Sequence, residues 1–227
     1  MDDKDSLLKL LRIGFKDIKI LEQAFNHRSY LNENKGILMS NERLEFLGDS
    51  VLSLVVSSAL FKLRPQDAEG DLTNLRAYIV KTKSLSTAAQ RLNLGKYLKL
   101  SKGEEMGGGR ENPQLLANTY EALLGAIYLD QGLEVVREVV EKTLLSIFAS
   151  ELKIGPPKDA KSNLQEIVQE KFKQSPHYKI IGTHGPDHAK EFVVGVFIKG
   201  KEMGKGAGSS KQDAEEQSAK EALEKLD

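Results

Sequence analysis

The sequence has no cysteine and no tryptophan, and its 33 basic residues are balanced by 33 acidic residues. The missing thiols exclude disulfide bridges, thiolate zinc sites and cysteine nucleophiles. Any bound metal must therefore use oxygen or imidazole ligands. The zero net charge removes the basic excess that is typical of nucleic-acid-binding proteins. A role of that kind must therefore be supported by the local arrangement of charge.

Long hydrophobic runs are also missing. The longest apolar stretch, residues 51–61, contains serines and is shorter than the roughly 20 residues that a membrane span needs. The first residues, MDDKDSLLKL, are acidic where a secretory signal is basic. These features predict a cytoplasmic protein without a membrane partner. A content of 40% hydrophobic residues excludes a chain that is disordered throughout.

The first two thirds of the chain have the apolar spacing of helices. Apolar residues recur with a period near 3.6, and Gly, Pro, Asn and acidic residues gather between the periodic segments. The breaks fall at 32–35, 64–70 and 103–113. The predicted helices cover residues 6–11, 17–25, 42–63, 72–92, 115–128 and 133–148. Residues 1–148 are therefore predicted to form an all-α domain.

A second domain is predicted to follow a short linker. The sequence KIGPPKD at 153–159 contains two prolines, which prevent a helix from continuing, and we place the linker at 149–158. In residues 159–227 the pattern predicts helices at 162–173 and 210–226 and strands at 178–183, 191–198 and 201–205. This order, α-β-β-β-α, indicates a small α+β domain.

Two of the apolar helices carry polar groups that need partners. In the first, Glu45 and Asp49 are four residues apart on one face, where like charges destabilise a helix. In the second, Glu121 is the only charge within LLANTYEALLGAIYL, and Asn118 lies one turn before it. Groups of this kind in a largely buried helix require either a cation or hydrogen-bond partners.

Two interpretations of these four residues remain open. In the first, they form a metal site across a helix–helix contact, where oxygen ligands favour Mg²⁺ or Mn²⁺. In the second, Glu45 or Asp49 pairs with a basic side chain, while Asn118 and Glu121 bond to helix ends or to each other. The candidate basic partners are Arg43, Arg76 and Lys81.

Three segments carry a resemblance to a known family. The sequence NERLEFLGDS at 41–50 resembles the signature helix of ribonuclease III, and LANTYEALLGAIYLD at 116–130 resembles its second catalytic helix. EGDLTNLRAYIV at 69–80 is similar to the helix between them, and the tail from 159 resembles the family's double-stranded RNA-binding domain. The resemblance covers nearly the whole chain and implies an all-α endonuclease domain before that small domain.

The resemblance also implies roles for individual residues. Glu45, Asp49 and Glu121 correspond to the metal-binding acids, of which Asp49 and Glu121 are catalytic. Glu42 and Glu69 correspond to a secondary acidic pair near the RNA path. The alternative interpretation is that Glu42 is an acid favoured by the dipole at a helix start, and that Glu69 is an ordinary loop acid before a helix. Phe46 corresponds to an aromatic residue inserted into the partner subunit of a homodimer, although such a residue can also belong to an ordinary core.

Asn118 departs from the family pattern, which has Asp at the fourth metal-binding position. An amide oxygen can still bind magnesium or hold its water, but the site loses one negative charge. An alternative function is therefore a dimeric double-stranded RNA-binding protein with weak or no catalytic activity. A further alternative is an unrelated helical metal-dependent hydrolase fused to an RNA-binding domain.

The small domain has slightly more acidic than basic residues, but its lysines gather near the segment GKGAGSSKQ. Lysines beside free backbone N–H groups at a helix start, with Ser210 and Lys211, fit the phosphates of an RNA duplex. Gly206 and Gly208 would permit a close approach of the RNA. One helix face suits the minor groove, and His188 matches the family's loop contact with the next groove. That face is formed by Ser162, Gln165, Glu166 and Gln169.

The sequence therefore predicts a magnesium-dependent endoribonuclease that hydrolyses double-stranded RNA, with Mn²⁺ as a substitute for Mg²⁺ and no organic cofactor. The resemblance implies a homodimer in which each subunit cuts one strand. It implies staggered ends with 5′-phosphate and 3′-hydroxyl groups, and roles in ribosomal RNA and messenger RNA processing.

Overall fold

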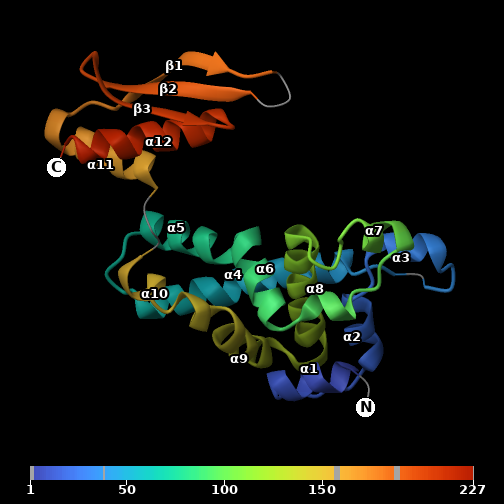
Figure 1. Ribbon diagram of the computed structural model, residues 1–227. Helices are drawn as coiled ribbons and strands as arrows, with labels where there is room; N and C mark the ends of the chain where they lie inside the picture. The colour runs from blue at the N-terminus through green and yellow to red at the C-terminus, as the bar shows by residue number, and fades with distance from the viewer. Residues whose placement is uncertain (1–2, 38, 156–158, 187–189, 227) are drawn as a thin grey trace. The chain divides into compact units, whose positions relative to one another are not determined.

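The computed structural model describes residues 3–37, 39–155, 159–186 and 190–226 (Figure 1). The chain divides into two compact units, Met1–Pro156 and Pro157–Asp227. A short helix, Glu151–Ile154, lies within the predicted linker at 149–158. The loop prediction for His188 lies outside the described residues.

The described part of the first unit is helical apart from one isolated bridge between Asn26 and Lys99, which confirms the predicted class. Two 3-10 turns, η1 (Leu94–Tyr97) and η2 (Leu145–Phe148), accompany its α-helices. The α-helices are α1 (Asp3–Leu11), α2 (Ile18–Ala24), α3 (Arg28–Glu33), α4 (Glu42–Leu63), α5 (Glu69–Val80), α6 (Thr82–Arg91), α7 (Lys102–Met106), α8 (Pro113–Gln131), α9 (Leu133–Thr143) and α10 (Glu151–Ile154).

Several helix boundaries differ from the prediction. The segment predicted as one helix over 72–92 is two, because Lys81 has an extended backbone, with ψ of 152°, between α5 and α6. The sequence did not predict the short helices α3, α7 and α10. They lie in segments that were predicted as breaks or as linker, or for which no element was predicted. Local capping stabilises two of them: His27 accepts a hydrogen bond from the Ser29 N–H, and Ser101 from the Glu104 N–H.

Helix α4 is the longest element of the first unit and runs through its core. By length and composition alone it could span a membrane, with a mean hydropathy of 1.6, and in this respect the prediction that no stretch is long enough was wrong. Its apolar residues instead contribute to the hydrophobic core, together with residues of α5, α6, α8 and α9. The buried residues of α4 are Leu44, Gly48, Val51, Leu52, Val55, Val56 and Leu60.

The most extensive contact between two elements is that of α4 with α8, which runs across it (Figure 1). Glycines allow the two backbones to touch. A Cβ atom at Gly48 would overlap the carbonyl oxygen of Glu121, and one at Gly125 would overlap the carbonyl oxygen of Leu44. A side chain at either position would therefore push the helices apart.

The second unit has the predicted order α-β-β-β-α. Its elements are α11 (Ala160–Phe172), β1 (His177–His184), β2 (Glu191–Ile198), β3 (Lys201–Gly208) and α12 (Lys211–Glu224). The strands form an antiparallel sheet in the order β1-β2-β3, and both helices cover one face of it (Figure 1). Its core consists of Ala160, Leu164, Val168, Val196, Ile198, Ala219 and Ala222.

The glycines of β3 have a structural role that differs from the predicted one. A Cβ atom at Gly206 would overlap the backbone nitrogen of Ser218, and one at Gly208 would crowd Asp213. These residues therefore let β3 pack directly on α12. This contact explains why both residues are glycine, so a close approach of RNA is not needed to explain them.

Candidate active site

The crossing of α4 and α8 brings the four polar residues of the two apolar helices to one place. Gly48 lies between Glu45 and Asp49 in the sequence and contacts the backbone of Glu121. Asn118 lies one turn before Glu121 on α8, so its side chain shares that side of the helix. The backbone contact at Gly48 therefore fixes which turns of the two helices meet.

The carboxylates at this crossing influence one another strongly. Burial, together with the charges of the nearby Asp49 and Glu45, raises the pKa of Glu121 to about 8. Burial is also the main cause that raises the pKa of Glu45, followed by the charge of Glu42, while a hydrogen bond from Asn118 acts in the opposite direction. The cluster is therefore a partly buried group of like charges.

The interpretation of these acids as members of ordinary ion pairs is wrong. In the described ranges, no lysine or arginine lies within ion-pair distance of Glu45, Asp49 or Glu121. Two of the candidate cations are engaged elsewhere. Arg76 donates to the Ser57 hydroxyl at 3.0 Å, and the Lys81 ammonium lies 3.7 Å from the centre of the Tyr78 ring.

The Asn118 side chain is hydrogen-bonded to a neighbour on its own helix. Its Oδ1 accepts a hydrogen bond of 2.7 Å from Nε2 of Gln114, one turn earlier on α8. Its side chain is also close enough to the Glu45 carboxylate on the other helix to oppose the rise in the pKa of that group. The prediction from sequence missed Gln114, although its spacing of four residues from Asn118 was a signal that the two share a face.

The chemistry of these residues fits a hard divalent cation, because three carboxylates and an amide offer only oxygen ligands. Within the part of the chain that the structure describes, no three His, Cys, Asp or Glu side chains are already gathered as a metal site. The backbone contact at the α4–α8 crossing brings the residues near one another, and a cation bound there would require their carboxylates to turn toward it. Mutual repulsion opposes that rotation until a cation is bound.

The secondary acids take up different positions. Glu42 begins α4, accepts a hydrogen bond of 2.8 Å from the Ser40 hydroxyl and lies 3.9 Å from Arg28. Glu69 is the exposed first residue of α5. Their role near RNA stays a prediction.

Phe46 does not belong to the core. Its side chain is 78% exposed on α4, which contradicts the ordinary core interpretation. Beside it lies a cavity of 590 Å³ whose apolar walls come from α4, α8 and the segment before α4. The residues that line this cavity are Gln23, Met39, Glu42, Arg43, Leu44, Phe46, Leu47 and Leu129.

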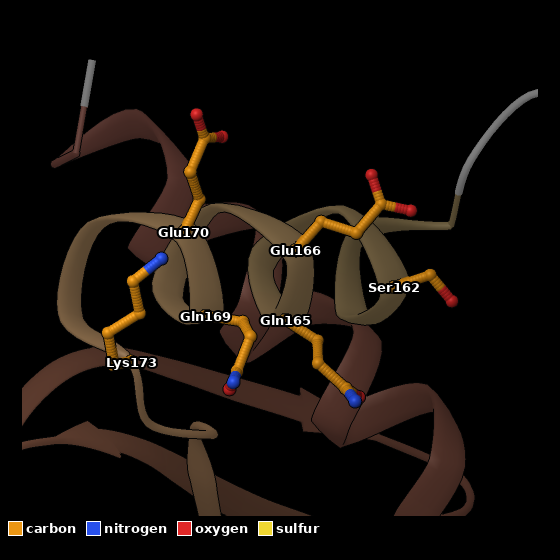
Figure 2. A pocket seen from close by; sticks show the side chains of 6 residues that line it. All are labelled: Ser162, Gln165, Glu166, Gln169, Glu170 and Lys173. Atoms are coloured by element: carbon orange, nitrogen blue, oxygen red, sulfur yellow. The ribbon is translucent and has the colours of Figure 1, made fainter.

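The second unit places its predicted RNA-binding residues on α11 and at the start of α12. Figure 2 shows Gln165 and Gln169 pointing to one side of α11 and Glu166 and Glu170 to the other. With Ser162 and Lys173 they line an open hollow of 540 Å³. The Ser162 hydroxyl is engaged in capping, because it donates to Asp159 at 2.9 Å.

At the start of α12, Ser210 accepts a hydrogen bond of 3.1 Å from the Asp213 N–H. It therefore caps the helix and occupies one of the N–H groups predicted to be free. Lys211 is exposed, with its ammonium 5.9 Å from the centre of the Phe192 ring. This lysine remains available for a phosphate.

Comparisons with known proteins agree with this architecture. Residues 17–148 match a family model described as ribonuclease-III-like, and residues 160–226 match the double-stranded RNA binding motif. The chain is 47% identical to ribonuclease 3 of Desulforamulus reducens, over 100% of this chain and 93% of the relative. It is 48% identical to ribonuclease 3 of Anoxybacillus flavithermus, over 94% of this chain and 90% of the relative.

Among solved structures, the nuclease domain of Campylobacter jejuni ribonuclease III is similar to the first unit. It is 41% identical, covers 63% of this chain and 96% of its own, and has a TM-score of 0.59. That structure is described as showing flexibility in a region involved in dimer formation.

Proposed function

Because this chain belongs to the ribonuclease III family and is an endoribonuclease for double-stranded RNA, we propose that it cuts both strands with Mg²⁺ bound at the α4–α8 crossing. The observation that carries this proposal is the group of Glu45, Asp49 and Glu121, which has no basic partner in the described residues. A partly buried cluster of like charges is unfavourable by itself and becomes favourable when a cation binds.

In this proposal Asp49 and Glu121 act at the reacting phosphate, and Glu45 completes the cation site. A bound divalent cation, Mg²⁺ or its substitute Mn²⁺, supplies a Lewis acid that polarises the phosphoryl oxygen and offsets the charge of the departing 3′ oxygen. The raised pKa of Glu121, about 8, means that this residue holds a proton at neutral pH in the metal-free protein. It must release that proton when it becomes a ligand.

The second unit is proposed to hold the RNA duplex by its shape. Gln165 and Gln169 project together from α11, where their amides can bond to 2′-hydroxyls and base edges in the shallow minor groove. Lys211 supplies positive charge at the start of α12 for a phosphate across the deep groove. In this proposal the local arrangement of charge allows RNA binding although the net charge of the chain is zero.

We also propose that two copies of the chain form the active enzyme. Phe46 is too exposed for a side chain that has no partner, and the apolar cavity of 590 Å³ lies directly beside it. In a dimer with two-fold symmetry, each Phe46 can enter the cavity of the other copy. The dimer-forming region described for the C. jejuni nuclease domain supports a dimer in this family.

In the dimer each subunit would cut one strand and leave staggered ends with 5′-phosphate and 3′-hydroxyl groups. Such products suit the maturation of ribosomal RNA precursors and the processing of messenger RNA in the cytoplasm, which we propose as the setting. Glu42 and Glu69 would then lie near the RNA path in the assembled dimer.

The second candidate is a dimer that binds double-stranded RNA but cleaves it weakly or not at all. It is favoured by Asn118, whose amide replaces a carboxylate at the candidate site. Incubation of a duplex RNA with the protein, with Mg²⁺ or with a chelator, distinguishes the two functions. Mg²⁺-dependent cleavage by the natural chain supports the proposed enzyme, and cleavage only by the Asn118→Asp variant supports the second candidate.

A further inference from the structure

A polar hollow of 370 Å³ lies at the start of α8, and His27, Arg28, Glu104 and Gln114 are among the residues that line it. Its walls come from the starts of α3 and α8 and from α7. Gln114 is also hydrogen-bonded over 2.7 Å to Asn118, which lies one turn before Glu121 on the same helix. The polar hollow therefore adjoins the α4–α8 crossing, although none of the three carboxylates of the crossing lines it.

His27 offers a hydrogen-bond donor to this hollow. The backbone N–H of Ser29 donates a hydrogen bond of 3.3 Å to Nδ1 of His27, and this bond caps α3. A ring nitrogen that accepts a hydrogen bond carries no proton, so the proton of the neutral ring is on Nε2. Burial lowers the pKa of His27 against the opposing charge of Glu104, and a lower pKa favours the neutral ring. Among the residues that the structure describes, Nε2 has no hydrogen-bond partner.

Hydrogen bonds between the two walls hold the donor in place. The backbone N–H of His27 donates to the carbonyl oxygen of Lys99 at 3.1 Å, and the N–H of Ser101 donates to the Ser29 hydroxyl at 3.0 Å. The helices α3 and α7 therefore lie side by side (Figure 1). Glu104 of α7 lines the same hollow and has no ion pair in the described ranges. A neutral donor and a carboxylate acceptor thus share one cavity.

This pair of groups suits a hydroxyl better than a phosphate. A hydroxyl can accept from an N–H group and donate to a carboxylate at the same time, whereas a carboxylate repels a phosphate. Each nucleotide of RNA carries such a hydroxyl at the 2′ position, and this group distinguishes RNA from DNA. The Arg28 side chain, which is 74% exposed, can pair with a phosphate beside that ribose.

We infer that the polar hollow binds the ribose of a nucleotide near the cleavage site, where His27 donates from Nε2 to the 2′-hydroxyl oxygen and Glu104 accepts from the same hydroxyl. His27 then determines specificity for RNA and takes no part in breaking the bond. The inference rests on the proposed function, because a cation site at the α4–α8 crossing would bring the cleaved strand past the start of α8.

Two substitutions at residue 27 separate the roles of the two ring nitrogens. Asparagine has a side-chain oxygen close to the position of Nδ1 and is a preferred N-cap residue, so His27→Asn keeps the cap of α3 and loses the donor. Glutamine is one carbon longer and can place an amide N–H close to the position of Nε2, so His27→Gln keeps the donor and loses the cap. The control is His177→Asn, at an exposed histidine of β1.

The substrates are an RNA hairpin with one cut site and a series of hairpins that each lack a single 2′-hydroxyl near the cut. For the natural full chain with Mg²⁺, we expect kcat/KM to fall about fivefold at one position of the series, as the loss of one hydrogen bond predicts. His27→Asn should show no such penalty, because the donor is missing. His27→Gln and the control should retain the penalty at the same position.

Three results would overturn the inference. The first is the absence of a penalty at any position with the natural chain. The second is an equal penalty in His27→Asn, even if that variant cleaves every hairpin more slowly, since a purely structural role lowers all the rates together. The third is loss of the penalty in both variants, because discrimination would then not follow the donor.

Mobility shifts with the same hairpins in a chelator separate this inference from the proposed function, because binding is then measured without a cation. If Mg²⁺ supports no cleavage while the binding penalty still follows the donor at residue 27, the proposed cation site fails and the ribose site stands. If cleavage depends on Mg²⁺ and no penalty depends on residue 27, the cation site stands and the ribose site is wrong.

Discussion

The carbonyl oxygen of Glu121 occupies the space that a Cβ atom of residue 48 would need, so that only glycine fits at this point of α4. Gly125 has the same relationship to Leu44 in the opposite direction. Two backbones in direct contact thereby place carboxylates of separate helices together. The position of the cluster depends on the absence of two side chains as much as on the acids themselves.

Replacing Gly48 by alanine is expected to destabilise the protein by about 3 kcal/mol, because the added methyl group meets backbone that cannot rotate away. Urea denaturation measures the change. The matched control is Gly70→Ala in α5, where no atom lies within 4 Å of the added Cβ. A stability of Gly48→Ala equal to that of the control would show that α4 and α8 are not in contact.

The stability of the metal-free protein should fall as the pH rises from about 4.5 to about 8, through the contribution of Glu121. Its pKa is raised to about 8 in the folded chain from the ordinary glutamate value of 4.5, so the folded state holds a proton that the unfolded state loses. This contribution is complete at low pH and is lost above the folded pKa.

Thermal melting between pH 5 and 9 in a chelator, on the natural protein and on Glu121→Gln, measures that contribution. The variant cannot ionise at this position, so it should lose less stability than the natural protein across this range. Identical pH profiles of the two proteins would contradict the raised pKa.

Phe46→Ala should weaken the dimer, because it removes the side chain proposed to enter the apolar cavity of the other copy. Analytical ultracentrifugation should show a dissociation constant at least about tenfold higher, as expected for an aromatic anchor. Met106→Ala, at a side chain that is 89% exposed on α7, is the control. A dimer that is equally stable in both variants would exclude Phe46 from the interface.

Replacing Gln165 and Gln169 together by alanine should weaken binding of a duplex RNA by about tenfold or more, since each amide can contribute about 1 kcal/mol. The fold should not change, because both side chains are exposed. Electrophoretic mobility shifts measure the affinity, with the exposed Gln217→Ala on α12 as control. If the double variant and the control bind alike, this face of α11 does not contact RNA.

The site was predictable from the sequence to the extent that it depends on local spacing. The separation of four residues between Glu45 and Asp49, and of three between Asn118 and Glu121, placed each pair on one helix face. That the two faces meet depends on the helix crossing. Its sequence signal was Gly48 between the first two acids, which the spacing argument did not use.

Other features were hidden from the sequence for identifiable reasons. The break at Lys81 falls inside a continuous apolar period and has neither glycine nor proline to mark it. The small helices α3, α7 and α10 are too short to show a period, and local capping stabilises the first two. The exposure of Phe46 depends on packing between helices, which the period of a single helix does not reveal.

The cleavage rate of a duplex RNA by Glu121→Gln, with Mg²⁺ in excess, tests the proposed cation site most directly. Glu138→Gln, at an exposed glutamate of α9, is the control for the same change of charge. We expect Glu121→Gln to cleave roughly 100-fold more slowly or worse while it binds the RNA as tightly as the control does. Equal cleavage by the two variants would contradict a cation bound between α4 and α8.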